Sequence, residues 1–156
     1  MEEMYSIAKR EHINIRWWNF HPPIRGAYWA PPDVPPVIFL DYSLSHNTAL
    51  LRCVFAEELG HHFTLDRHCL CQPYFNYRDR LNISRSEFRA CRWAAQYLMP
   101  KQRVFNALKN GYVNKWDLAE YFEVIEDMVN FRMNLPDMQS IVLHSNNITG
   151  GEINGL

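Results

Sequence analysis

The chain has 156 residues, the length of one domain that can bury a sizeable hydrophobic core. Its formal net charge of −1 gives no electrostatic reason to bind nucleic acid or an anionic membrane. The acidic N-terminus lacks the basic segment followed by an apolar segment that makes a signal peptide, and no apolar run reaches the roughly 18 residues that span a bilayer. We therefore expect a cytoplasmic protein with no nucleic-acid or membrane partner, whose four cysteines are reduced thiols.

Residues 13 to 41 predict a small antiparallel or mixed sheet. Three runs of β-branched and aromatic residues, at 13–18, 24–29 and 37–41, each have the length of one strand. Proline pairs separate these runs, and proline cannot donate to a sheet ladder. The segment 30–36, which contains four prolines, is therefore expected to be a loop between strands rather than a partner-binding motif.

A helical period replaces the strand pattern from Ser43 onward. Ser43 or Ser45 is expected to cap a helix that runs to about Thr64. A loop with cysteine and arginine follows, and a second helix is expected from near Ser84 to Pro100, where proline ends it. Three more helices are predicted at 101–109, 116–122 and 126–133.

The order of these elements predicts an α+β fold, with the small sheet first and a helical core after it. We expect one domain over residues 1–135. From Pro136 to residue 156 the sequence is weakly patterned and ends in a glycine-containing stretch. This last segment is predicted to be a mobile tail.

The stretch that carries most chemical information is Glu57-Glu58-Leu59-Gly60-His61, which has the spacing of an HExxH zinc-peptidase helix with glutamate in the first position. In that arrangement the first and fifth residues bind the metal, and the second is the general base. A helical wheel places Glu57 and His61 in the apolar stripe and Glu58 at its edge. A carboxylate that faces a core is costly unless it is paired or metal-bound. The alternative is a surface helix that carries two acids and two histidines.

Glu87 is a third candidate ligand, because it is the acid in the middle of the apolar face of the next predicted helix. Its alternative role is structural. Ser84 and Glu87 have the spacing of a capping box, in which Glu87 binds the start of the helix. Both roles can coexist, since an inward-facing glutamate one turn into a helix can also reach a metal on another helix.

Residues 55–62, Phe-Ala-Glu-Glu-Leu-Gly-His-His, and residues 87–100, which end in Leu-Met-Pro, together resemble the ImmA/IrrE family of metallo-endopeptidases. The resemblance spans roughly residues 5 to 135 and implies a zincin-like helical core of the gluzincin type. It also implies that Glu58 is the general base and that His61 and Glu87 are metal ligands. Glu57 stands in the first ligand place.

The same resemblance implies a metal-dependent endopeptidase that cleaves a helix-turn-helix repressor of a phage or mobile element, with a metal-activated water and Glu58 as the base. Glutamate is an accepted zinc ligand, so Glu57, His61 and Glu87 can still form a zinc site. Two carboxylates also make Mn²⁺ or Fe²⁺ competitive with Zn²⁺. The alternative is a non-catalytic module of the same fold, which binds the repressor without cleaving it.

Two other sites come into consideration, a cysteine-containing metal site and a DNA-binding module. His68-Cys69-Leu70-Cys71 lacks the second half of a structural zinc motif, so a cysteine-bearing loop is favoured there. The helices of residues 115–134 have helix-turn-helix spacing, but their two basic residues are outnumbered by five acidic ones, whereas a DNA-reading module is basic. For an oxyanion donor, the sequence does not choose between His62, His68 and Tyr97.

Overall fold

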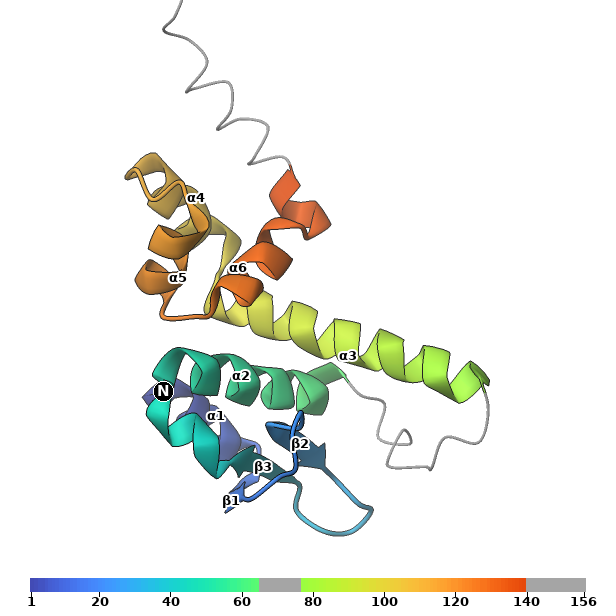
Figure 1. Ribbon diagram of the computed structural model, residues 1–156. Helices are drawn as coiled ribbons and strands as arrows, with labels where there is room; N and C mark the ends of the chain where they lie inside the picture. The colour runs from blue at the N-terminus through green and yellow to red at the C-terminus, as the bar shows by residue number, and fades with distance from the viewer. Residues whose placement is uncertain (65–76, 140–156) are drawn as a thin grey trace, which may run out of the picture.

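The computed structural model describes residues 1–64 and 77–139 of the chain. A small sheet, helix α2 (Thr48–Thr64) and helix α3 (Tyr77–Leu98) lie in three successive layers, and the remaining C-terminal helices gather at one end of α3 (Figure 1). This arrangement confirms the predicted α+β fold. No helix within the described ranges is long and apolar enough to cross a membrane.

The sheet has three strands, β1 (Asn14–Trp18), β2 (Gly26–Trp29) and β3 (Val37–Asp41), in the order β1-β3-β2. β3 pairs in parallel with β1 and antiparallel with β2, so the sheet is mixed, one of the two forms expected. Alternate side chains of a strand share one face. Ile38 and Leu40 therefore lie on the same face of β3, and both are fully buried.

Helix α2 begins later than predicted. Ser43 and Ser45 lie in a short 3-10 helix, η1 (Tyr42–His46), so neither serine caps α2. The cap is Asn47, whose side-chain oxygen accepts the backbone N–H of Leu50 at 3.0 Å. Asparagine satisfies the free N–H groups of a first turn as well as serine does, so the local pattern could not choose between these neighbours.

Two sides of helix α2 are buried, because the helix lies between the sheet and α3. Phe55, Ala56 and Leu59 are fully buried, and Glu58 and Gly60 are buried with them. A single apolar stripe describes a helix that packs on one layer only. The helical wheel therefore underestimated the burial of Glu58, which faces the sheet.

Helix α3 is longer than predicted, since it begins at Tyr77 rather than near Ser84. Ser84 lies inside the helix, and Glu87 is well beyond the first turn. The capping box of Ser84 and Glu87, which was the alternative role for Glu87, is therefore wrong, because capping needs a residue at the helix boundary. The spacing of serine and glutamate is equally compatible with the middle of a helix.

An N-terminal helix, α1 (Glu2–Arg10), was not predicted. Met4 and Ala8 are buried on one side of it, and the ring of Tyr5 contacts the ring of Phe55 in α2 edge-on at a centroid distance of 5.1 Å. Signals for this helix were present in the sequence. Acidic residues occupy its first turn and basic residues its last, which suits the helix dipole.

Helices α4 (Lys101–Lys109), α5 (Lys115–Phe122) and α6 (Glu126–Met133) form close to their predicted bounds. The side-chain oxygen of Asn114 caps α5 by accepting the backbone N–H of Asp117 at 2.9 Å. α5 and α6 pack against each other and bury apolar side chains in the core, among them Leu118, Phe122, Met128 and Val129.

Arg132, buried in α6, joins this helix to the residue that follows α3 and to the residues that follow α6. Its Nε donates to the carbonyl oxygen of Met99 at 2.8 Å, and its two terminal nitrogens donate to Asp137 at 3.0 and 2.8 Å. The paired guanidinium lowers the pKa of Asp137. Met138 is also fully buried, so the packed core extends beyond the boundary expected at residue 135. Residues 140–156 of the expected tail lie outside the described part of the chain.

Gly60 allows α2 and α3 to approach closely. A Cβ atom at this position would overlap the carbonyl oxygen of Ala90 and would lie 3.0 Å from the carbonyl carbon of the same residue. These are backbone atoms of a packed helix, so they cannot rotate away. The distance between the two helices therefore depends on the missing side chain at position 60.

We predict that Gly60→Ala destabilises the protein by about 1–3 kcal/mol, because the new methyl group forces the two helices apart. The sign of the change in unfolding free energy distinguishes a crowded position from an open one, since glycine to alanine in an unhindered helix interior stabilises a protein by about 1 kcal/mol. Urea unfolding of both proteins, followed by circular dichroism, measures the difference. An equal or higher midpoint for Gly60→Ala would show that the helices have room for the methyl group.

Candidate active site

Four polar side chains face one another across the contact between α2 and α3. Glu57 and His61 are one turn apart on α2, and Glu87 and Cys91 are one turn apart on α3. Side chains at this spacing share a helix face. The two helices therefore form two cross-helix pairs, His61 with Glu87 and Glu57 with Cys91.

In the first pair, His61 Nε2 lies 3.3 Å from Glu87 Oε2. The side chain of His61 is 12% exposed and that of Glu87 is 51% exposed, so the pair lies at the edge of the core with the carboxylate on the outer side. Burial on its own would lower the pKa of His61. The hydrogen bond with Glu87 and the nearby carboxylates of Glu58, Glu87 and Glu57 outweigh this effect and raise the pKa.

The second pair joins Cys91 Sγ and Glu57 Oε1 at 2.7 Å. Burial, reinforced by the hydrogen bond to Glu57 and by the charges of Glu57 and Glu87, raises the pKa of the Cys91 thiol. The thiol is therefore protonated at neutral pH. It is the donor of this hydrogen bond, and the carboxylate of Glu57 is the acceptor.

Glu58 points from the same helix toward the sheet instead of toward α3. Its side chain lies against Gly26, where a Cβ atom would be 2.6 Å from Glu58 Oε1 and 2.7 Å from Val54 Cγ1. A backbone N–H of Tyr28 donates to the carboxylate. Burial, together with the charges of Glu57 and Glu87, raises the pKa of Glu58 to about 8 against the opposing effect of His61.

The types of donor at the α2–α3 contact fit a divalent metal, because zinc is bound by imidazole nitrogen and carboxylate oxygen. Two ligands of a tetrahedral zinc ion, each bound at about 2.0–2.1 Å, lie roughly 3.3 Å apart. The separation of His61 Nε2 and Glu87 Oε2 matches this distance. No three such side chains of the described residues are arranged together to hold a metal. Glu57, the third candidate ligand, is hydrogen-bonded to Cys91.

The structure thus brings the residues predicted from the sequence to one place, with two differences. Glu57, His61 and Glu87 were expected to converge on one point, but only His61 and Glu87 are in contact with each other. Glu58 was expected at the edge of an apolar stripe, but it is 7% exposed and belongs to the contact between α2 and the sheet.

The oxyanion donors left open by the sequence have different surroundings. His62 Nδ1 is hydrogen-bonded to the hydroxyl of Tyr28 at 2.9 Å, and its Nε2 lies 3.7 Å from a carboxylate oxygen of Glu11. The ring of Tyr97 stacks on Trp93, and its hydroxyl is hydrogen-bonded to Glu3 of α1. His68 and the segment His68-Cys69-Leu70-Cys71 lie outside the described residues.

Three residues of this site were missed by the sequence analysis: Gly26, Tyr28 and Cys91. The available signal for Cys91 was its spacing of four residues from Glu87, which puts both side chains on one helix face. Gly26 and Tyr28 lie on β2, whose approach to α2 is a contact between distant parts of the chain. No local pattern marks such a contact.

The sequence profile of the IrrE N-terminal-like domain, a peptidase family, matches residues 19–134. This range contains β2, α2 and α3, and with them all the residues of the two cross-helix pairs and of the Glu58 environment. It confirms the resemblance to the ImmA/IrrE family. No curated protein and no solved structure gives a match.

We predict that, in metal-free protein, Glu58→Gln raises the melting temperature more at pH 8 than at pH 5. Between pH 4.5 and about 8 the folded protein keeps a proton on Glu58 that the unfolded chain has released, so stability falls as pH rises through this window. Glutamine carries no such proton linkage. Thermal unfolding in EDTA at both pH values measures the effect. A gain of the same size at pH 5 and pH 8 would contradict the buried, protonated state of Glu58.

Proposed function

Since the chain belongs to the IrrE N-terminal-like domain family of peptidases, we propose that it is a metal-dependent endopeptidase whose substrate is a helix-turn-helix repressor of a phage or mobile element. The observation that carries this proposal is the contact of His61 with Glu87, at a ligand-to-ligand distance, next to a buried glutamate on the same helix. In this proposal His61, Glu87 and Glu57 hold the metal, and Glu58 is the general base.

A divalent metal held by His61, Glu87 and Glu57 would supply the Lewis acidity that peptide hydrolysis needs at the scissile carbonyl group. Glu58 takes the proton of the attacking water and passes it to the nitrogen of the leaving amine. A carboxyl group serves both steps best when its pKa is near the working pH, and burial moves the pKa of Glu58 in that direction. The backbone of Gly26 and Tyr28 fixes where this carboxyl group lies.

We propose Zn²⁺ as the metal, with Mn²⁺ and Fe²⁺ as competitors. Zinc accepts one imidazole and two carboxylates, but oxygen ligands are harder than nitrogen and sulfur ligands and suit Mn²⁺ well. For the metal to have three protein ligands, the carboxylate of Glu57 must reach it while remaining beside Cys91, or must leave Cys91.

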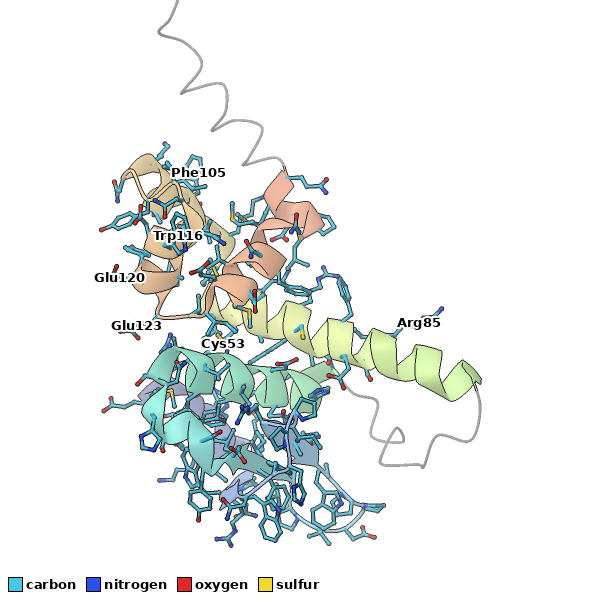
Figure 2. The ribbon with its side chains drawn as sticks, in the orientation of Figure 1. Cys53, Arg85, Phe105, Trp116, Glu120 and Glu123 are labelled. Carbon is cyan, nitrogen blue, oxygen red and sulfur yellow. The ribbon has the colours of Figure 1, made fainter. Side chains whose placement is uncertain are left out.

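The proposed substrate class is supported by the charge of the C-terminal helices. A groove at the start of α2 and along α5 and α6 is lined by four acidic side chains, Glu120, Glu123, Glu126 and Asp127. Glu120 and Glu123 project outward from this end of the molecule (Figure 2). Glu123 is paired with Arg52 and Glu126 with Lys115, so Glu120 and Asp127 give the groove its remaining negative charge. A DNA-binding repressor carries an excess of basic residues, and this charge favours its approach.

A second candidate function is a module of the same fold that binds the repressor without cleaving it. The observation that favours it is the Glu57–Cys91 hydrogen bond, which occupies one oxygen of the residue in the first ligand place. Metal analysis of the purified protein, followed by incubation with the repressor, separates the two functions. An endopeptidase contains metal and yields defined fragments, whereas a binding module forms a stable complex with the intact repressor.

We predict that Glu58→Gln lowers the rate of repressor cleavage by about 10²- to 10⁴-fold, because the amide cannot accept the proton of the attacking water. Metal content should be retained, since Glu58 lies on the sheet side of α2 and not in the cross-helix pairs. Gel analysis of the fragments and elemental analysis of the protein give the two readouts. Glu2→Gln, at an exposed position of α1 outside the acidic groove, is the control for the same substitution at another site. Cleavage at the unchanged rate in Glu58→Gln would remove Glu58 from the chemistry.

A further prediction concerns Glu57, the residue in the first ligand place. Glu57→Gln should weaken metal binding, because a neutral amide is a poorer ligand than a carboxylate. Glu57→His should strengthen zinc binding, because it gives the two-histidine, one-glutamate ligand set of thermolysin-type sites. Calorimetric titration of the metal-free proteins with Zn²⁺ gives the three affinities. Equal affinities would show that residue 57 is no ligand and would favour the non-catalytic module.

A further inference from the structure

Cys91 is the side chain at the α2–α3 contact that the proposed mechanism does not use. It lies one turn beyond Glu87 on α3, and its Sγ is 2.7 Å from Glu57 Oε1. The same carboxylate replaces the histidine of the HExxH pattern. The thiol therefore contacts the one proposed ligand whose residue type departs from that pattern.

The chemistry of this contact leaves Glu57 able to bind a cation. The thiol donates to a single oxygen, Oε1, and a carboxylate has a second oxygen with free lone pairs. A neutral thiol also adds no negative charge to a region that already holds three carboxylates. The hydrogen bond orients Glu57 without competing with a metal for both oxygens.

Glutamate needs such support more than histidine does. A glutamate side chain has three rotatable bonds and a histidine side chain has two, so glutamate loses more conformational freedom when it becomes a ligand. Partners that hydrogen-bond to metal ligands hold them in position, and mutation of such a partner typically lowers metal affinity by about 10- to 100-fold. Cys91 is placed to give this support from the opposite helix.

We propose that Cys91 is a positioning residue, which holds the carboxylate of Glu57 in place for metal binding through the Sγ–H···Oε1 hydrogen bond. This inference rests on the proposed function, because it takes Glu57 as a ligand. The assignment makes two demands. First, a side chain that donates the same hydrogen bond must be able to substitute for Cys91 without loss of metal affinity. Second, the loss of metal affinity on removing the donor must occur only when Glu57 is present.

The test compares Cys91→Ala, which removes the donor, with Cys91→Ser, which keeps it. Titration of the metal-free proteins with Zn²⁺ is expected to give an affinity about 10- to 100-fold weaker for Cys91→Ala and close to the unchanged value for Cys91→Ser. In a Glu57→Ala background, Cys91→Ala should have no further effect. Cys53→Ala is the matched control, because Cys53 is a buried cysteine of α2 whose Sγ contacts the backbone N–H of Ile125.

Titration with Co²⁺ adds a readout that separates positioning from direct coordination. The visible bands of bound Co²⁺ are expected without a sulfur-to-cobalt charge-transfer band. Such a band, lost in Cys91→Ser, would make the sulfur a ligand and overturn the positioning role. Unchanged Zn²⁺ affinity in Cys91→Ala would overturn it as well, while leaving the proposed metal site standing. A protein that binds neither metal in any variant would overturn the proposed function and this inference together.

Discussion

The close approach of α2 and α3 at Gly60 is the constraint on which the candidate site depends. Gly60 precedes His61, and Ala90, whose carbonyl oxygen occupies the space left by the missing side chain, precedes Cys91. Because the two backbones meet there, the short thiol of Cys91 can reach Glu57 and the imidazole of His61 can reach Glu87. Any wider spacing of the helices would break the thiol contact first, since cysteine is the shortest of the four side chains.

The charges at this contact explain why its side chains are paired as they are. Three carboxylates, Glu57, Glu58 and Glu87, influence a single imidazole, that of His61. The electrostatic cost of each carboxyl group is reduced in a different way. Glu87 contacts His61 and is half exposed, and Glu57 accepts a hydrogen bond from a thiol. Burial favours the neutral, protonated form of Glu58. A partly buried group of acids is costly without a cation, and a divalent metal bound by Glu57 and Glu87 would lower that cost.

Local sequence patterns predicted the positions of most strands and helices, and the wrong helix boundaries also have local explanations. The strands and the helices α4 to α6 formed where periodicity and proline placed them, because these signals act within one element. The caps of α2 and α3 were misplaced, since several serines and one asparagine satisfy the same local rule and only the surrounding packing selects among them. Helix α1 was overlooked although its charges and its buried Met4 and Ala8 fit a short amphipathic helix.

The sequence by itself determined the family and the residue types of the candidate site. Spacing of four residues puts Glu57 and His61 on one helix face, and the paired motifs of α2 and α3 identify the ImmA/IrrE type. Only the tertiary structure decided that Glu58 is buried against Gly26, that Cys91 is hydrogen-bonded to Glu57, and that His61 and Glu87 are in contact. The reason is physical, because the periodicity of a sequence fixes only the direction of each side chain around its own helix axis. These contacts depend instead on the distance between elements that are far apart in the chain. Gly60, which has no side chain, sets that distance for α2 and α3.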